Sequence, residues 1–436
     1  MRTREQLKAA AFAAIDANRD KITAFGDSIY HEPELGYKEV KTAGKFKTLL
    51  EELGYDYKDK VARTGVIANL KGKKSKYRVA VMAELDAIVV PGHKDACQET
   101  GAAHACGHHC MMASLAGVAI ALKGTGIMEE LAGDIVLMAV PAEEGVEIEF
   151  RNGLRQKGEI SFLGGKQEFI KLGVFDDVDF MIMQHIKKKT SDKEAEVSSN
   201  CNGFVSKLVQ YIGKEAHAGG APHEGINALN AAILGLSAIH AQRETFRSED
   251  YIRVHPIITK GGTLVNVVPD DVRIETYVRG ANAPAILDAA KKVDRALKSG
   301  GDAVGAETKI IDIPGYMPFN FSEELIDVVY ENLCALYGTE KVDRMGPGFG
   351  GGSTDAGDVS QLIPTVHMYI AGASGNLHTE EFAVADKESA YLTAAKALTA
   401  TAIDLLYDEG QTGEFVKKNF KAQLTKETYL KEWGKL

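Results

Sequence analysis

Three uninterrupted apolar runs constrain the fold of this chain most strongly. They are YRVAVMAELDA (77–87), GDIVLMAVPAEEG (133–145) and VDFMIMQHI (178–186). Runs without polar alternation are typical of strands that are buried on both faces, and helical patterns such as 111–124 lie between them. The sequence therefore predicts an α/β fold, with a large domain built on a mixed, mostly parallel sheet between helices.

The pattern changes near residue 197. From there to residue 311, strand and helix patterns follow one another in the order β-α-β-β-α-β, which is a split βαβ unit of ferredoxin-like type. Helices and apolar strands resume after residue 311, so we expect one domain over 1–196 and 312–436 with an inserted α+β domain over 197–311. The polar tail beyond about residue 411 is expected to pack loosely.

Composition excludes several classes of protein. The 436 residues carry a net charge of −10, which argues against broad nucleic-acid binding. The odd number of cysteines, five, suits free thiols in a reducing compartment. The N-terminus lacks the apolar core of a signal peptide, and no apolar run approaches the length of a membrane span. We therefore expect a cytoplasmic protein with no nucleic-acid or membrane partner.

Polar side chains follow the predicted buried strands. Asp86, the pair Glu143 and Glu144, and His185 lie at or just past the carboxyl ends of the three runs. In sheets of this kind ligands bind at strand ends. A pair of glutamates is also common in a solvated turn, and a single histidine at a strand end is often a core residue, so each signal alone is weak.

The stretch HACGHHC (104–110) concentrates the side chains that bind transition metals best. A closed structural zinc site would need a second Cys/His pair, which does not follow at the usual spacing. A redox pair would need C-x-x-C, whereas Cys106 and Cys110 are spaced C-x-x-x-C. Two alternatives stay open: Cys106 and His108 bind a metal with ligands from distant segments, or the stretch is a loop of partly buried polar side chains.

A series of motifs runs in a fixed order along nearly the whole chain. The motifs are HEPELGYKE (31–39), AELDA (83–87), HACGHH (104–109), PAEEG (141–145), the strand ending in His185, HAGGAPHEGINAL (217–229), NVVPD (266–270), VRG (278–280) and NLHTEEF (376–382). In this order they resemble the aminoacylase and amidohydrolase family of two-metal metallopeptidases. GGSTDAGDVS (351–360) is similar to the branch of aminobenzoyl-glutamate hydrolases and related dipeptidases.

The resemblance implies roles for residues in the large domain. The implied metal ligands are Cys106, His108, Glu144, His185 and His378. Glu143 would be the general base, and Asp86 would orient a ligand without touching the metal. Soft cysteine and imidazole ligands favour zinc, whereas carboxylates and water admit manganese, so the implied cofactors are two divalent ions of zinc or manganese.

Residues of the inserted domain complete the implied site. His217 and Asn266 would stabilise the reacting carbonyl, and in this family they act across a dimer interface. Arg279 would hold the carboxylate of the substrate, a task for which its planar fork is better suited than a lysine. The inserted domain would then serve as a lid and as the contact between the subunits of a homodimer.

Two positions depart from the family pattern. After CGH the family commonly has Asp or Asn, and here it is His109. It has three open roles, as a ligand, as a hydrogen-bond donor or as an inert residue, and we expect it to orient a ligand. Many relatives carry a ligand histidine two residues before the strand-end aspartate, where this chain has Glu84, and this departure puts the second metal position in doubt.

The implied function is hydrolysis of an amide bond to an amino acid that carries a free carboxylate. N-acyl amino acids, conjugates similar to aminobenzoyl-glutamate, and dipeptides all fit this description as small-molecule substrates. The alternative is a non-catalytic protein that binds metal or ligand on the same fold. Loss of Glu143 would mark that alternative, and the residue is present.

Overall fold

The computed structural model describes residues 2–197, 201–346 and 351–435. The chain divides into two compact units, the first built from Met1–Ser199, Asn320–Gly348 and Asp358–Lys426 and the second from Asn200–Phe319, Phe349–Gly357 and Glu427–Leu436. The segments 349–357 and 427–436 group with the second unit, although they lie within the range predicted for the large domain.

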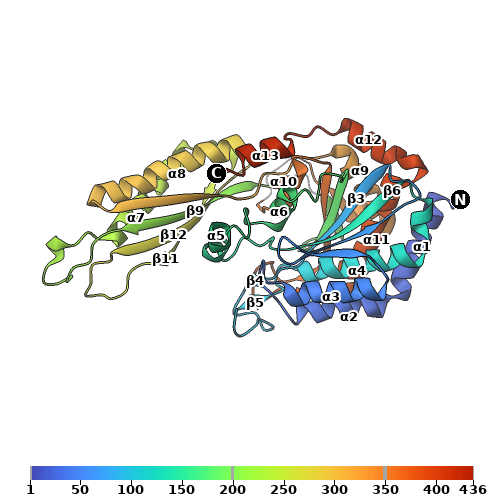
Figure 1. Ribbon diagram of the computed structural model, residues 1–436, viewed down its shortest axis with the longest axis horizontal. Coiled ribbons are helices and arrows are strands. Elements are labelled where there is room, and N and C mark those ends of the chain that lie inside the picture. The colour runs from blue at the N-terminus through green and yellow to red at the C-terminus, as the bar shows by residue number, and fades with distance from the viewer. Residues whose placement is uncertain (1, 198–200, 347–350, 436) are drawn as a thin grey trace. The chain divides into compact units, whose positions relative to one another are not determined.

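A mixed sheet forms the centre of the first unit (Figure 1). Within the described residues it has nine strands in the order β1-β2-β6-β3-β7-β15-β8-β14, with β16 paired to β15. The central neighbours β6, β3, β7 and β15 are all parallel, as the apolar runs predict. The bounds are β1 Tyr57–Val61, β2 Gly65–Leu70, β3 Tyr77–Glu84, β6 Gly133–Val140, β7 Phe180–Lys188, β8 Ala195–Val197, β14 Val342–Arg344, β15 Thr365–Ser374 and β16 Ala383–Val384, and a separate pair is β4 Ile88–Val89 with β5 Ala102–Ala103.

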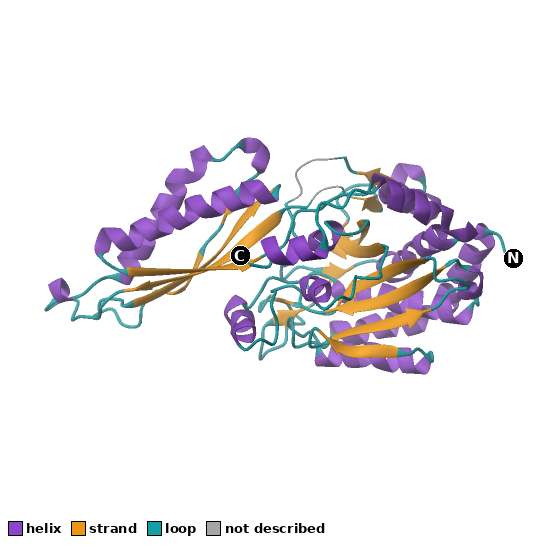
Figure 2. Ribbon diagram, turned by 45° about the horizontal axis from the view of Figure 1, so that its top comes forward, coloured by secondary structure: helices purple, strands orange, loops and turns teal. Residues whose placement is uncertain are grey.

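Helices flank this sheet (Figure 2). Helix α4 packs against β3 and β7, and nearly all of its side chains are buried because α1, α2 and α11 cover its other sides. The helices are α1 Arg4–Ala17, α2 Arg19–Tyr30, α3 Val40–Glu52, α4 His108–Gly124, α5 Ile148–Gln156, α6 Gly165–Lys171, α9 Glu323–Tyr337, α10 Ala356–Ser360, α11 Ala394–Leu406 and α12 Gln411–Asn419. The predicted α/β fold class is confirmed.

The second unit pairs an antiparallel sheet with two long helices. Its strands run in the order β10-β12-β9-β13, with β11 also paired to β12. Burial alternates along β12, so one face of the sheet lies under the helices. Its elements are β9 Gly203–Ile212, α7 Ala228–Gln242, β10 Arg253–Val254, β11 Ile257–Lys260, β12 Asp271–Gly280, α8 Ala283–Val304 and β13 Glu307–Pro314, which gives the β-α-β-β-α-β order with its second strand broken into β10 and β11. Its roles as lid and as dimer contact stay predictions.

The C-terminal tail is ordered, so the expectation of loose packing is wrong. Helix α13 (Lys426–Glu432) buries Tyr429, and Trp433 directly after it is 3% exposed. The indole Nε1 of Trp433 donates to the carbonyl of Gly315 at 2.9 Å. The two aromatic side chains, one in α13 and one directly after it, are both buried, which is enough to fix a segment that is otherwise polar.

Within the described part of the chain, no helix combines the length and the apolar character needed to cross a lipid bilayer. This finding agrees with the absence of long apolar runs in the sequence.

Helices α7 and α8 touch through their backbones, and this contact predicts the effect of a substitution. A Cβ on Gly300 would lie 2.3 Å from the carbonyl oxygen of Ala231 and 2.5 Å from the amide nitrogen of Gly235. Gly300→Ala should therefore separate the helices and destabilise the protein by about 1–3 kcal/mol, as overpacking does. Gly44→Ala on α3, where a Cβ meets no atom within 4 Å, is the matched control. Thermal unfolding of Gly300→Ala at the wild-type temperature would contradict this packing.

Candidate metal centre and active site

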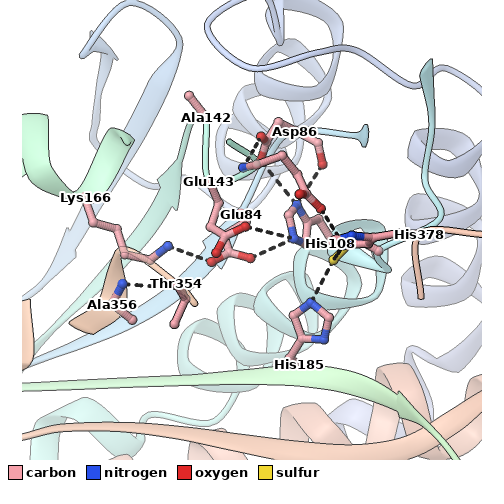
Figure 3. Close-up of polar contacts among 12 residues, drawn as sticks. Glu84, Asp86, His108, Ala142, Glu143, Lys166, His185, Thr354, Ala356 and His378 are labelled. Atoms are coloured by element: carbon pink, nitrogen blue, oxygen red, sulfur yellow. Dashed lines mark hydrogen bonds and ion pairs between the residues drawn. The ribbon is translucent and has the colours of Figure 1, made fainter. Parts of the chain in front are cut away.

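The predicted site residues of the first unit gather at the carboxyl edge of its parallel strands (Figure 3). Glu84, the last residue of β3, lies opposite Val140, the last residue of β6. His185 on β7 lies opposite Tyr369 of β15. Because parallel strands end at one edge, residues far apart in the sequence meet there. Figure 3 shows Glu84, His108, Glu143, His185 and His378 turned toward a common centre.

Left-handed backbone turns aim several of these side chains. Gly107, between Cys106 and His108, has φ 95°, and a Cβ there would lie 2.2 Å from Cγ2 of Ile186. A glycine is therefore required between the two predicted ligands. His378 itself has φ 62°, and its amide donates to the carbonyl of Ala105 at 2.9 Å. This bond ties the loop of His378 to the residue that precedes Cys106.

The PAEEG turn contains a third left-handed residue. Ala142 has φ 57°, a conformation that costs a residue with a Cβ about 1–2 kcal/mol. The two following carboxylates then diverge. Glu143 Oε2 lies 3.9 Å from Nε2 of His108, whereas Glu144 Oε1 lies 3.2 Å from Nε2 of His378.

Potential metal-binding atoms form two groups that share one sulfur. Cys106 belongs to a group with His108 and His185, and also to a group with Glu144 and His378. Its Sγ is 3.2 Å from Nε2 of His185 and 3.2 Å from Nε2 of His378. All five predicted ligands are therefore brought together, and Cys106 stands between the two groups.

Hydrogen bonds outside the cluster set the tautomers of two histidines. Nδ1 of His108 lies 2.8 Å from the backbone carbonyl oxygen of Asp86, and Nδ1 of His185 lies 2.7 Å from that of Ile186. A carbonyl only accepts, so both Nδ1 atoms carry a proton and Nε2 is the atom that faces the cluster. Asp86 also places Oδ1 3.2 Å from Nδ1 of His108 and accepts the amide of Glu144 at Oδ2, at 2.9 Å. It thereby orients one predicted ligand and the backbone of another.

Several buried atoms of the cluster have ion-pair neighbours but no well-aligned hydrogen bond. Oε2 of Glu84, Nε2 of His108 and Oε1 of Glu144 are buried without a hydrogen bond from any described residue. Nε2 of His108 nevertheless lies 3.0 Å from Oε2 of Glu84. Burial opposes the charge of His108, but Cys106 and Glu84 override it and raise the pKa of His108 well above its usual value, so without a metal this contact is an ion pair. Ligand atoms about 2.1 Å from one tetrahedral ion are about 3.4 Å apart, so the spacing of 3.0–3.2 Å suits divalent metal ions.

Burial and nearby charges shift the pKa values of the two neighbouring glutamates in opposite directions. Burial, with the charges of Glu84 and Glu144, raises the pKa of Glu143 well above its usual range. Burial also disfavours the charge of Glu144, but the imidazole of His378 overrides it and lowers the pKa of Glu144 to about 2. Two adjacent carboxyl groups thus differ in proton affinity, which allows one to stay ionised as a ligand and the other to exchange a proton.

Burial also acts on the nitrogen and sulfur atoms of the cluster. It lowers the pKa of His185 to about 4, so the imidazole is neutral at pH 7, as a ligand must be. Burial and the charge of Glu144 raise the pKa of the Cys106 thiol well above its usual value. A thiolate at this position therefore depends on a positive charge beside it.

Lys166 is a site residue that the sequence analysis missed. Its Nζ lies 2.6 Å from Oε1 of Glu84, and both side chains are buried. Glu84, the position that departs from the family pattern, forms a third group of potential ligands with His108 and Glu143. A single lysine in a glycine-rich segment gives no sequence signal, because its partner lies 82 residues away.

His109 lies apart from the groups of potential ligands. Its Nε2 is 3.4 Å from Sγ of Cys110, and its ring packs against the rings of Tyr30 and Tyr391. The side chain of His109 is therefore hydrogen-bonded to that of Cys110 and not to a predicted metal ligand.

The remaining predicted residues belong to the second unit. His217 is exposed, and its Nδ1 accepts the amides of Gly219 and Gly220 at 3.2 and 2.9 Å, so Nε2 carries the proton and faces outward as a donor. Its loop pairs with that of Asn266, whose carbonyl accepts the amide of Ala218 at 3.0 Å.

Arg279 lies on β12 of the same unit. It stacks on Phe204, and its Nη1 donates to the carbonyl of Gly351 at 2.9 Å. Burial lowers the pKa of Arg279, yet a guanidinium stays charged at neutral pH, so this side chain remains able to bind an anion.

Comparisons with known proteins identify the family. The family described as peptidase family M20/M25/M40 matches residues 80–404, which is well over half of the chain. Among curated relatives, the Xaa-Arg dipeptidase of Mus musculus is 27% identical over 98% of this chain and 95% of its own length.

Two solved structures share the fold. A dinuclear metal binding peptidase from the M20 family of Bacillus subtilis has a TM-score of 0.65 and 22% identity, with 90% of this chain and 99% of that chain covered. An aminobenzoyl-glutamate utilization protein from Klebsiella pneumoniae has a TM-score of 0.67 and 20% identity, with 89% and 96% covered.

These matches agree with the motif series and with the gathering of metal-binding side chains. The family predicted from the sequence is confirmed, and membership favours the enzyme over the non-catalytic alternative. The chain belongs to peptidase family M20/M25/M40, and it is a metal-dependent hydrolase of amide bonds.

Proposed function

We propose that this protein hydrolyses the amide bond between an acyl group and an amino acid with a free carboxylate, using two divalent metal ions. The observation that carries the proposal is the pair of potential ligand groups that share the sulfur of Cys106. Beside them, Glu143 and Glu144 direct their carboxylates to different partners.

The ligands of the two ions follow from these groups. Cys106 would contact both ions, His108 and His185 would hold one, and Glu144 and His378 would hold the other. When bound, zinc or manganese polarises the amide carbonyl and lowers the pKa of water to about 7.

Glu143 moves the proton in this mechanism. Its carboxylate takes a proton from the attacking water and later delivers that proton to the nitrogen of the leaving amino acid. The pKa of Glu143, raised by burial and by its carboxylate neighbours, suits a group that must both accept and return a proton.

His217, Asn266 and Arg279 would contact the substrate. The outward donor of His217 and the side-chain amide of Asn266 would stabilise the negative charge on the reacting oxygen. The guanidinium of Arg279 would bind the free carboxylate of the amino acid.

Exposed apolar side chains support a homodimer through the second unit. Ile233 and Leu234 on α7 are 49% and 43% exposed, and Ile257 and Ile258 on β11 are 60% and 43% exposed. An exposed apolar edge strand and an apolar patch are typical of a surface that another chain covers.

A hydrolysis screen tests the proposed function. The panel contains N-acyl amino acids, aminobenzoyl-glutamate and dipeptides, including dipeptides with C-terminal arginine because one relative is an Xaa-Arg dipeptidase. Each substrate is assayed with the apoprotein and after addition of zinc or manganese. We expect metal-dependent release of the amino acid, and lower activity on the same amides with an esterified carboxylate.

Cys106→Ser should impair metal binding at both positions. A serine hydroxyl stays protonated where a cysteine becomes a thiolate ligand. Metal content and chelator competition are measured on the purified variant. Cys110→Ser, at another buried cysteine that lies in the first turn of α4 and is hydrogen-bonded to His109, is the matched control and should retain metal. Full metal occupancy in Cys106→Ser at wild-type affinity would remove Cys106 from the ligand set.

Glu143→Gln should keep the metal and the fold but lose nearly all turnover. Glutamine has nearly the same shape but cannot accept a proton at neutral pH. General-base catalysis contributes about 10²–10⁴-fold, and we expect a loss in kcat at or beyond the upper end because Glu143 also protonates the leaving amine. Glu144→Gln should instead release metal. Retention of more than about a tenth of the wild-type kcat in Glu143→Gln would refute the mechanism, since even the smallest such contribution is larger.

Mixing two inactive variants tests the role of His217 across the dimer. A His217→Ala chain and a Glu143→Ala chain are each expected to be inactive alone. If His217 serves the site of the partner subunit, the hybrid dimer should regain one working site. Mass spectrometry verifies that hybrids form, and hybrids without recovered activity would argue for a role within one chain.

A further inference from the structure

The motif HEPELGYKE (31–39) has no role in the mechanism above, yet it lies against the turn that carries Glu143. Its last residue, Glu39, is fully buried. Oε1 of Glu39 accepts the amide of Ala142 at 2.8 Å, and Oε2 accepts the hydroxyl of Thr64 at 2.6 Å. The carboxylate thus binds the residue directly before Glu143.

Arg151 binds the other backbone polar group of the same residue. Its Nη1 donates to the carbonyl of Ala142 at 3.3 Å and to that of Leu163 at 2.8 Å. The guanidinium is 1% exposed and lies 5.5 Å from the centroid of the Tyr37 ring. A buried carboxyl group and a buried guanidinium therefore hold the amide and the carbonyl of Ala142.

The glycine of the motif, Gly36, packs directly against Ala142 and Arg151. A Cβ at this position would lie 2.9 Å from Cα of Ala142 and 2.3 Å from Nη2 of Arg151. Only a residue without a side chain allows the motif to approach the turn this closely.

The contacts to Ala142 matter because its backbone conformation sets the direction of the two glutamates that follow it. Its φ of 57° is left-handed, which a residue with a Cβ adopts only where the surroundings enforce it. Ala142 follows the end of β6 and precedes both site carboxylates (Figure 3). A change to the common right-handed or extended backbone would redirect Glu143 and Glu144 together.

We propose that Glu39 and Arg151 are positioning residues that lock Ala142 in its left-handed conformation and thereby place the carboxylates of Glu143 and Glu144. For Glu143 the inference rests on the proposed general-base function. For Glu144 it concerns metal binding, which is measured without catalysis.

Glu39→Leu tests the inference, because leucine leaves the buried amide of Ala142 without an acceptor. We expect a loss in kcat of about 10²-fold, the size typical of a catalytic group displaced by about 1 Å, with KM close to wild type. Chelator competition should show weaker metal binding. Hydrogen exchange, followed by mass spectrometry, should be faster in the peptide that contains Ala142.

Conservative variants separate positioning from charge and from folding. Glu39→Gln retains an acceptor for Ala142, and Thr64 can reverse its hydroxyl, so kcat and metal affinity should stay near wild type. In the Glu39→Leu background, Ala142→Gly should restore part of the loss, because glycine adopts the left-handed conformation without steric cost. Ala142→Val, which leaves Glu39 and Arg151 intact, should reproduce the defect.

Asp134→Leu is the matched control. Asp134 also accepts one backbone amide, that of Gly72 at 2.9 Å, and one hydroxyl, that of Ser75 at 3.0 Å, but it lies at the opposite end of β6. This variant should retain kcat and metal affinity.

Two results would overturn the inference. One is wild-type kcat and metal affinity in Glu39→Leu despite faster exchange at Ala142. The other is an equal loss of both in Asp134→Leu, which would indicate general destabilisation. Full activity of Glu143→Gln would instead refute the proposed function, and metal affinity in Glu39→Leu would then decide the inference alone: weaker binding supports it and unchanged binding overturns it.

Discussion

A set of buried carboxyl groups at the carboxyl edge of the sheet is the constraint on which this structure depends. The carboxylates concerned are Glu39, Glu84, Asp86, Glu143 and Glu144, all of them in the interior of the first unit. Burying a carboxylate without a partner costs free energy, so each of these groups needs a hydrogen-bond donor or a cation. Lys166 forms an ion pair with Glu84, and backbone amides donate hydrogen bonds to Glu39 and Asp86. Glu84, Glu143 and Glu144 also belong to the groups of potential metal ligands, which ties the stability of this edge to its chemistry.

The sequence predicted that the candidate site residues meet at one edge of the sheet, because parallel strands impose it. Once three apolar runs are assigned to one parallel sheet, Asp86, Glu143 and His185 must meet at one edge. The sequence did not predict the side chains that support them. Lys166, Glu39 and Arg151 act on partners set by the folded chain, and the contact of Glu39 with Ala142 spans 103 residues. Single charged residues of this kind have no periodicity or spacing that marks them.

Local patterns predicted the elements of the second unit but not everything that packs on it. Alternating burial along β12 and the long amphipathic α8 are visible as residue periodicity. The C-terminal helix was missed because its contribution rests on Tyr429 and Trp433 within an otherwise polar tail. Two aromatic side chains hardly change the polar composition of the tail, from which loose packing was expected. They nevertheless bury enough apolar area to dock a helix.

The shared sulfur of Cys106 has a consequence for how the protein responds to acid. Burial favours the protonated thiol, so binding of metal to this sulfur, as proposed, would displace a proton. Because both groups of potential ligands use the same sulfur, one proton competes with two ions. With the proposed ligand set, acidification would therefore weaken metal binding at both positions through this one atom.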